Sequence, residues 1–243
     1  MKKFLLIIFI AVCAVFIYLK VGSLGDPDSR FNQTTRFKLG EYSALRTIFS
    51  LHNDGDARGW YLAGAGQIDI EVARAENVEM DEIALQNFVN QVGQYTGRPV
   101  QLFNAGAIKS GRLTAADLAD INASRRHRVA SGDTNLFVIY ADDFARQSGE
   151  VGETYQETAV ALSDKRLKEV TGGNPEAFSQ YLQSTLLHEF GHQIGLEHNS
   201  RPNCIMNVKV EQPDRQAAFT GFYTPTQFCD FELKQLETVK AGF

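Results

Sequence analysis

Hydrophobic and polar positions alternate clearly once the chain has passed residue 65. Ile68, Ile70 and Val72 alternate with Asp69 and Glu71, which is typical of a half-buried β-strand. Three further apolar runs predict strands at residues 99–103, 135–140 and 158–163. The run at 135–140, NLFVIY, is apolar enough to lie at the centre of a sheet.

Capping residues predict three helices among these strands. Asp81 can cap a helix that ends at Thr96-Gly97, and Thr114 can cap a shorter helix with the sequence AADLADINASRR. Asn174-Pro175-Glu176 combines an N-cap, a proline in the first helical position and an acid in the first turn, so it predicts a long helix that stops near Gly195. This order of strands and helices indicates an α/β or α+β fold.

The N-terminus has a different pattern. Lys2 and Lys3 precede an apolar run, residues 4–19, that is closed by Lys20, as in an export signal. The run fits a cleaved signal peptide, an N-terminal membrane anchor or, as a third reading, a buried core helix; we favour the anchor. Residues 1–21 are therefore assigned to a signal or anchor, and the rest of the chain is expected outside the cytoplasm, where disulfides persist.

Composition and charge bear on the number of domains and on the class of partner. The 243 residues are 44% hydrophobic, which is enough for one good-sized core, and the net charge of −5 gives no sign of nucleic-acid binding. Residues 22–64 begin as a polar tether and then become ambiguous. Residues 65–243, where the strand and helix patterns lie, are expected to form the folded domain.

Residues 188–206, HEFGHQIGLEHNSRPNCIM, hold three of the five histidines. His188 and His192 are one helical turn apart, so both imidazoles can reach one ion. Gly195 can end the helix and turn the chain back, which brings His198 to the same ion as a third ligand. Three histidines leave a position open on Zn²⁺, which is typical of a catalytic site. The other two histidines, His52 and His127, are assigned no role.

Glu189 lies beside this site without being a ligand. It is expected to act as the general base for a water activated by zinc, and to pass the proton to a leaving amine. The reading that competes with a metal site is that the three histidines are ordinary surface or core residues. The five fixed positions of HExxHxxGxxH make that reading the weaker one.

These residues form the metzincin signature, and Met206 fits the Met-turn beneath the zinc. Within metzincins the chain most resembles archaemetzincins, with matrixins second, through LTAADL (113–118), NLFVIY, AVALSDKRL (159–167) and QFCDFELKQL (227–236). The resemblance implies that residues 65–243 form a single catalytic domain with an α+β fold. Its upper part, to residue 195, would hold a twisted mixed sheet, a backing helix and an active-site helix, and its small lower part, residues 196–243, would end in a helix. It also implies that an edge strand near residues 158–163 pairs with an extended substrate.

The chain departs from the family at one place. Archaemetzincins carry four cysteines after the motif that hold a second zinc. Only Cys204 and Cys229 match them, and Asn199 and Glu232 stand at the other two positions. The resemblance therefore implies one catalytic zinc without a structural one, and a Cys204–Cys229 disulfide in place of the lost metal.

Three functions remain open at this point. The first is an exported zinc metallopeptidase that acts on peptides or proteins, and that contacts the membrane through its N-terminal segment if this is not cleaved. The second is a zinc-binding interaction protein without activity, which the intact Glu189 disfavours. The third is a zinc hydrolase that acts on another amide, such as one in the cell wall. Residues 208–227 are expected to form the pocket wall, with Phe219, Phe222 and Tyr223 suggesting an apolar pocket.

Overall fold

The structure is a computed structural model that describes residues 2–23, 39, 45, 55, 57–127, 132–144, 151–155, 158–207, 210 and 224–243. The chain divides into two compact units, Met1–Asn53 and Asp54–Phe243. The first contains helix α1 (Lys2–Ser23). Among the residues described, no helix is both long and apolar enough to cross a membrane. The second unit takes in residues 54–64, which the sequence left ambiguous, as well as the expected catalytic domain.

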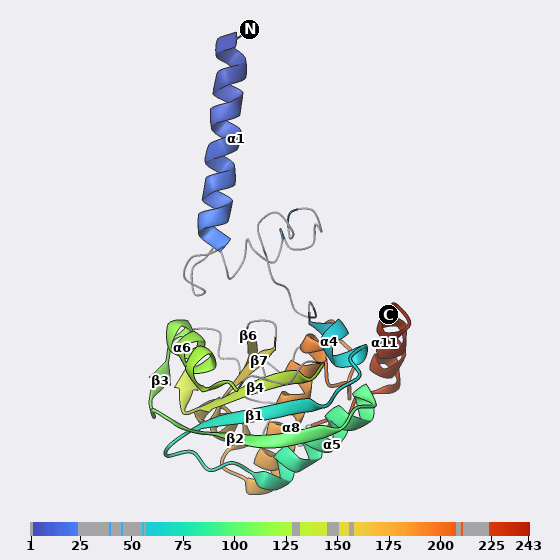
Figure 1. The fold of residues 1–243 in the computed structure, drawn as a ribbon. Helices are drawn as coiled ribbons and strands as arrows, with labels where there is room; N and C mark the ends of the chain where they lie inside the picture. The colour runs from blue at the N-terminus through green and yellow to red at the C-terminus, as the bar shows by residue number, and fades with distance from the viewer. Residues whose placement is uncertain are drawn as a thin grey trace. The chain divides into compact units, whose positions relative to one another are not determined.

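A five-stranded sheet forms the centre of the second unit (Figure 1). Its order is β2-β1-β4-β7-β6; the first four strands are parallel, and β6 pairs antiparallel with β7 at the edge. The strands are β1 (Ile68–Ala75), β2 (Val100–Ile108), β4 (Thr134–Ala141), β7 (Ala159–Ser163) and β6 (Gly152–Tyr155). The four strands expected from the sequence are confirmed. Two short strands, β3 (Arg112–Leu113) and β5 (Asp143–Phe144), form a separate pair.

The three expected helices are also present, each with its expected cap. They are α5 (Glu82–Thr96), α6 (Ala115–Arg125) and α8 (Pro175–Gln193), capped by the side chains of Asp81, Thr114 and Asn174. The unit also contains α4 (Arg58–Leu62), α7 (Asp164–Thr171) and α11 (Asp230–Lys240). The sequence reading missed α7, which Ser163 caps and Gly172 ends in a left-handed conformation.

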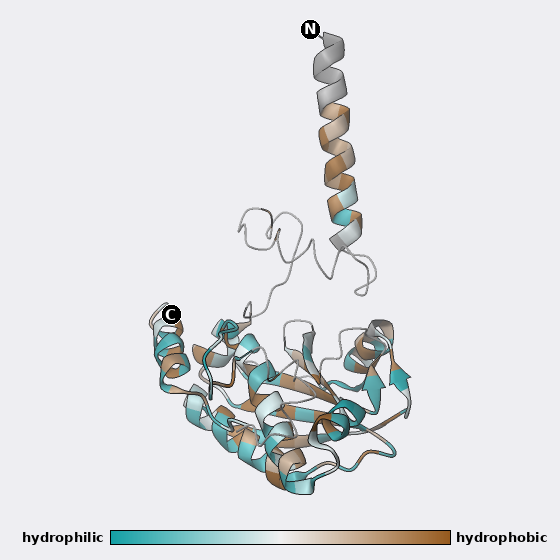
Figure 2. Cartoon of the chain, turned by 180° about the vertical axis from the view of Figure 1, so that it is seen from behind, coloured by the Kyte–Doolittle hydropathy of each residue, from teal (hydrophilic) through white to brown (hydrophobic). Residues whose placement is uncertain are grey.

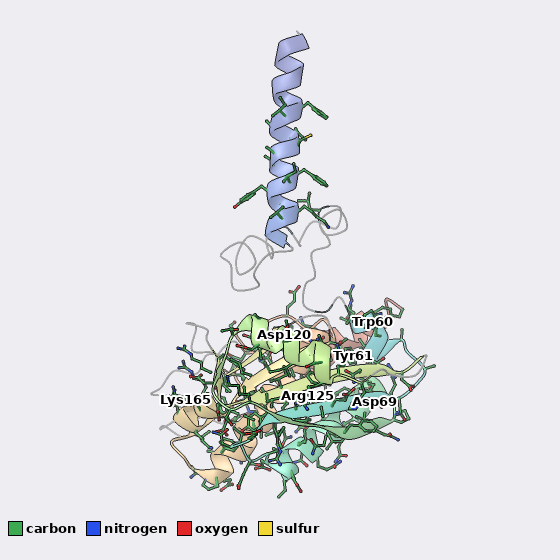
Figure 3. The ribbon with its side chains drawn as sticks, turned by 60° about the vertical axis from the view of Figure 1, so that its left-hand side comes forward. Trp60, Tyr61, Asp69, Asp120, Arg125 and Lys165 are labelled. Carbon is green, nitrogen blue, oxygen red and sulfur yellow. A yellow bond between two sulfur atoms is a disulfide. The ribbon has the colours of Figure 1, made fainter. Side chains whose placement is uncertain are left out.

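Helices α5 and α8 pack against each other. The connection through α5 runs from β1 outward to β2, and the connection through α6 runs back to β4, so right-handed crossovers put α5 and α6 on opposite faces. The ring of Phe190 in α8 makes edge-to-face contacts with Phe88 of α5, at 6.1 Å between centroids, and with Tyr61 of α4, at 5.4 Å. Figure 3 shows Trp60 and Tyr61 near Asp69, at the end of the sheet where β1 begins, with Lys165 of α7 at the opposite end.

The strands supply much of the hydrophobic core. All eight residues of β4 are buried, and Figure 2 shows apolar residues concentrated along the strands. The polar face of β1 departs from the half-buried pattern, because Glu71 is only 1% exposed. Its carboxylate accepts hydrogen bonds from the backbone N–H of His127 and from Asn135, and it lies 2.7 Å from His127 Nδ1. His127 therefore pairs with Glu71, away from the histidine motif.

Candidate metal centre

Helix α8 and the turn after it bring the three motif histidines together. His188 and His192 lie one turn apart near the end of the helix. Gly195 then adopts φ 85°, and its N–H donates to His192 O while Leu196 N donates to Gly191 O. This is a Schellman ending, which reverses the chain at a residue without Cβ. The expected end of the helix is confirmed, and it carries His198 back to the other two histidines.

The three Nε2 atoms form a nearly equilateral triangle. His188 and His192 are 3.2 Å apart at Nε2, and each lies 3.1 Å from His198 Nε2. Tetrahedral zinc with nitrogen ligands at 2.0–2.1 Å places those nitrogens about 3.3–3.4 Å from one another. The donor set and its spacing therefore fit one zinc ion.

Burial and hydrogen bonding prepare these imidazoles to act as ligands. His188 is fully buried, and its Nδ1 lies 2.7 Å from Ile205 O, a contact that leaves Nε2 free of its proton for a metal. Burial, with the neighbouring His188 and His198, holds the pKa of His192 well below its usual range. His198 is exposed, so the triangle of nitrogens lies at the surface of the domain.

Glu189 lies beside the histidines and contacts the edge strand. Its side chain is 1% exposed, and Thr154 Oγ1 of β6 donates to its Oε2 at 2.9 Å. A Cβ built on Gly152 would lie 2.9 Å from Glu189 Oε1 and 2.7 Å from Thr185 Cγ2. The strand therefore approaches the carboxylate so closely that residue 152 has no room for a side chain.

Met206 packs against the helix between the first two ligands. It is fully buried, and a Cβ on Gly191 would lie 2.3 Å from its sulfur. Gly191 thus lets the methionine approach the backbone of α8, as expected for a Met-turn that packs without ligating. Asn199 N donates to Met206 O at 2.8 Å, so the residue after the third histidine is tied to the same turn.

The predicted disulfide is present. Cys204 and Cys229 are bonded, with their Cα atoms 5.1 Å apart. The other two positions of interest also meet, since Asn199 Nδ2 donates to Glu232 Oε1 at 3.1 Å. The sulfur atoms of Cys204 and Cys229 and the carboxylate of Glu232 lie as close together as the ligands of a metal ion would. The two sulfur atoms, however, are bonded to each other in the disulfide. A covalent bond and a hydrogen bond thus join the segments that carry these four residues.

One expectation about the site needs correction, and another lies outside the described residues. Strand β7 is not at the edge of the sheet, because β6 covers it, so the edge beside the site is Gly152–Tyr155. Because the sequence placed the edge strand near residues 158–163, it did not indicate Gly152 and Thr154 as residues of the site. Phe219, Phe222 and Tyr223, expected to line a pocket, lie outside the described residues, as does His52.

Comparison with known proteins shows which families the chain resembles in sequence. A sequence profile of the matrixin family matches residues 101–220. An archaemetzincin from Haloarcula marismortui is 34% identical over a match that covers 36% of this chain and 56% of that protein. The chain therefore matches only about half the length of this relative.

Two solved structures share the fold. The archaemetzincin from Methanopyrus kandleri superposes with a TM-score of 0.55 at 16% identity, over 72% of this chain and 95% of that one. A zinc-dependent peptidase from Methanocorpusculum labreanum superposes with a TM-score of 0.51 at 17% identity, over 69% and 99%. The α+β fold expected from the sequence is confirmed. In sequence, the chain is thus similar to the matrixins and to an archaemetzincin, the families that its histidine motif led us to expect.

Proposed function

We propose that this chain is an exported zinc metallopeptidase that holds one catalytic zinc. The observation that carries the proposal is the convergence of the three histidine Nε2 atoms, which lie 3.1–3.2 Å from one another. The buried carboxylate of Glu189 lies beside them, on the helix that carries His188 and His192. The relatives support it, since they are an archaemetzincin by sequence and a zinc-dependent peptidase by fold.

The residues around the site have separate roles in this proposal. His188, His192 and His198 hold the ion. When bound, zinc lowers the pKa of a water molecule and polarises a carbonyl oxygen. Glu189 takes the water's proton as general base and delivers it to the leaving amine, while Thr154 holds one oxygen of its carboxylate in place. Peptide hydrolysis needs both events, because an amine leaves readily only once it is protonated.

Strand β6 is the element best placed to bind substrate. It forms the edge of the sheet, and its Thr154 touches Glu189, so an extended peptide added along this edge would run beside the site. Main-chain hydrogen bonds to an edge strand suit a substrate with a continuous peptide backbone. This favours a peptide or protein over an isolated amide, such as one in the cell wall.

Export is supported by two independent features. The lysines and apolar run at the N-terminus have the pattern of a signal peptide or anchor. The Cys204–Cys229 disulfide lies in the domain that would be exported, and disulfides persist mainly outside the cytoplasm. Both features support the proposal that the catalytic domain lies outside the cytoplasm.

The direct test is cleavage of a mixed peptide library by the purified protein, with and without a chelator, read by mass spectrometry. We expect new termini that disappear with the chelator and return with added zinc. Zinc-loaded protein that cleaves no peptide would favour the zinc-binding interaction protein. Cleavage confined to cell-wall fragments in a parallel assay would favour the other amide hydrolase.

A further inference from the structure

Glu232 is a buried carboxylate with four hydrogen-bond donors around it. Its side chain is 0% exposed. Met206 N donates to Oε1 at 2.5 Å and Asn199 Nδ2 to the same oxygen at 3.1 Å. Ile205 N donates to Oε2 at 3.1 Å and Cys229 N to that oxygen at 2.9 Å. Groups that only donate surround both oxygens, which is the environment of an ionised carboxylate.

Only one of these bonds is explained by the helix that carries Glu232. The residue is third in α11, where a glutamate commonly reaches back to the backbone N–H of the cap, here Cys229. A surface glutamate would serve that purpose equally well. Burying a carboxylate is costly unless it is compensated, so the bonds to Ile205 and Met206 call for a separate explanation.

The bond to Met206 leads directly to a zinc ligand. Met206 N and Ile205 O belong to the same planar peptide unit. Its N–H donates to Glu232 Oε1, and its carbonyl oxygen lies 2.7 Å from His188 Nδ1. A carboxylate, a peptide unit and an imidazole therefore form a chain that ends at the Nε2 atom facing the other two histidines.

The physical effect of this chain has a definite direction. An anion at the N–H end of a peptide polarises it and increases the negative charge on its carbonyl oxygen, since linked hydrogen bonds strengthen one another. A more negative oxygen holds the Nδ1–H of His188 more firmly. A firmer bond at Nδ1 fixes the ring and increases the basicity of Nε2, as when a carboxylate bonds directly to a metal-binding histidine.

We propose that Glu232 is a positioning residue for the metal centre, and that it orients and polarises His188 through the Ile205–Met206 peptide unit. This rests on the proposed function, because it concerns how well the site binds zinc. The outer partners of metal ligands typically contribute about 10–100-fold to affinity, and one interposed peptide places Glu232 near the lower end.

The rival explanation is that Glu232 only fastens α11 to the Met206 turn. The chain offers a way to separate the two roles, because the Cys204–Cys229 disulfide fastens the same two segments without touching the peptide unit that bonds to His188. Removing the disulfide should weaken the fastening alone. Changing Glu232 to Gln keeps the shape but removes the charge.

The experiment compares zinc affinity, by chelator competition, with the unfolding temperature of zinc-free full-length protein in detergent. The proteins are the wild type, Glu232→Gln, the double variant Cys204→Ser with Cys229→Ser, and a control, Glu237→Gln, at an exposed position of the same helix. We expect about tenfold weaker zinc binding for Glu232→Gln. The double variant should unfold at a lower temperature yet bind zinc within about twofold of the wild type, and the control should match the wild type in both.

The proposal would be overturned if zinc affinity and unfolding temperature fell in the same proportion in Glu232→Gln and in the double cysteine variant. That result would mean that Glu232 only fastens α11 to the Met206 turn. The proposal would also be overturned if Glu232→Gln bound zinc like the wild type. Wild-type protein that binds no zinc at all would instead remove the proposed function.

A second measurement, on zinc-free protein labelled with ¹⁵N at histidine and methionine, does not depend on metal. The Met206 amide and the His188 Nδ1–H should resonate downfield in the wild type, as expected for protons in strong hydrogen bonds, and both should move upfield in Glu232→Gln. If that variant does not fold, the wild-type spectrum still decides, since an ordinary shift for the Met206 amide would contradict the bond to the carboxylate.

Discussion

Thr154 Oγ1 on the edge strand lies 2.9 Å from Oε2 of Glu189 on helix α8. The same hydroxyl lies 3.1 Å from the backbone oxygen of Glu189. The strand proposed to hold substrate and the residue proposed to move the proton are therefore in direct contact. A peptide that binds along β6 would be aligned with Glu189 by the same element that orients its carboxylate.

Replacement of Thr154 by Val should lower activity without loss of zinc. Valine has the same shape but cannot donate to the carboxylate. A hydrogen bond to a charged group contributes about 1.5–3 kcal/mol, which corresponds to roughly tenfold or more in rate. We expect kcat/KM for peptide cleavage to fall by about this factor. Thr238→Val, on the outside of α11, is the matched control and should behave as the wild type.

Replacement of Glu189 by Gln should separate catalysis from metal binding. Because Glu189 is proposed as a base and not a ligand, the variant should keep its zinc while kcat falls at least ~10²-fold. The measurement is zinc content and peptide cleavage on the same preparation. Glu176→Gln, at an exposed position in the first turn of the same helix, should alter neither. Parallel loss of zinc and activity at Glu189 would show that its role is wrongly assigned.

Replacement of His198 by Ala should remove most of the zinc. His188 and His192 would remain, but two ligands on one helix hold the ion far less tightly than three. We expect the affinity to fall by more than about 100-fold, beyond the range for outer partners of a ligand. His127→Ala is the matched control, since His127 pairs with Glu71 and should not affect zinc. Equal affinity in the His198→Ala protein would refute the third-ligand assignment.

Local signals explain which parts of this architecture the sequence predicted. Asp81, Thr114 and Asn174 each cap the helix that follows them, so the information lies within a few residues of the element. The histidine motif is equally local, because a helix and one glycine turn bring its members together. For such features the sequence pattern and the structure agree.

The features that the sequence did not predict depend on contacts between distant segments. Strand β6 has four residues, GETY, without a periodic pattern, and it pairs only because β7 offers an edge. Glu232 resembles an ordinary helix-capping residue, and its bonds to Ile205 and Met206 appear only when α11 lies against the Met206 turn. Glu71 reads as solvent-facing but is buried by partners from residues 127 and 135.

The proposed export of the second unit can be tested in intact cells. If the N-terminal lysines stay in the cytoplasm, the catalytic domain faces outward and added protease should digest it. Protection that ends when the outer layers are opened would place the domain in a periplasm-like space, which still agrees with export. Protection that persists until the inner membrane is broken would contradict export.

The close approach of Met206 to α8 predicts opposite effects for two glycine replacements. Alanine normally stabilises a helix relative to glycine by about 1 kcal/mol. At Gly93 of α5 an added Cβ would have its nearest contacts at 3.4 Å, so Gly93→Ala should raise the unfolding free energy by up to that amount. At Gly191 the Cβ would lie 2.3 Å from the Met206 sulfur, which must then move.

Overpacking of a buried site costs about 1–3 kcal/mol, and a contact as short as 2.3 Å favours the upper part of that range, above the gain of about 1 kcal/mol in helix propensity. Gly191→Ala should therefore lower the unfolding free energy, and it should also weaken zinc binding, because moving Met206 disturbs the peptide unit that bonds to His188. Denaturant unfolding of the two zinc-free variants measures the first effect, and chelator competition measures the second. If Gly191→Ala were as stabilising as Gly93→Ala, the methionine would have space to yield, and the tight packing of the Met-turn beneath the histidines would be refuted.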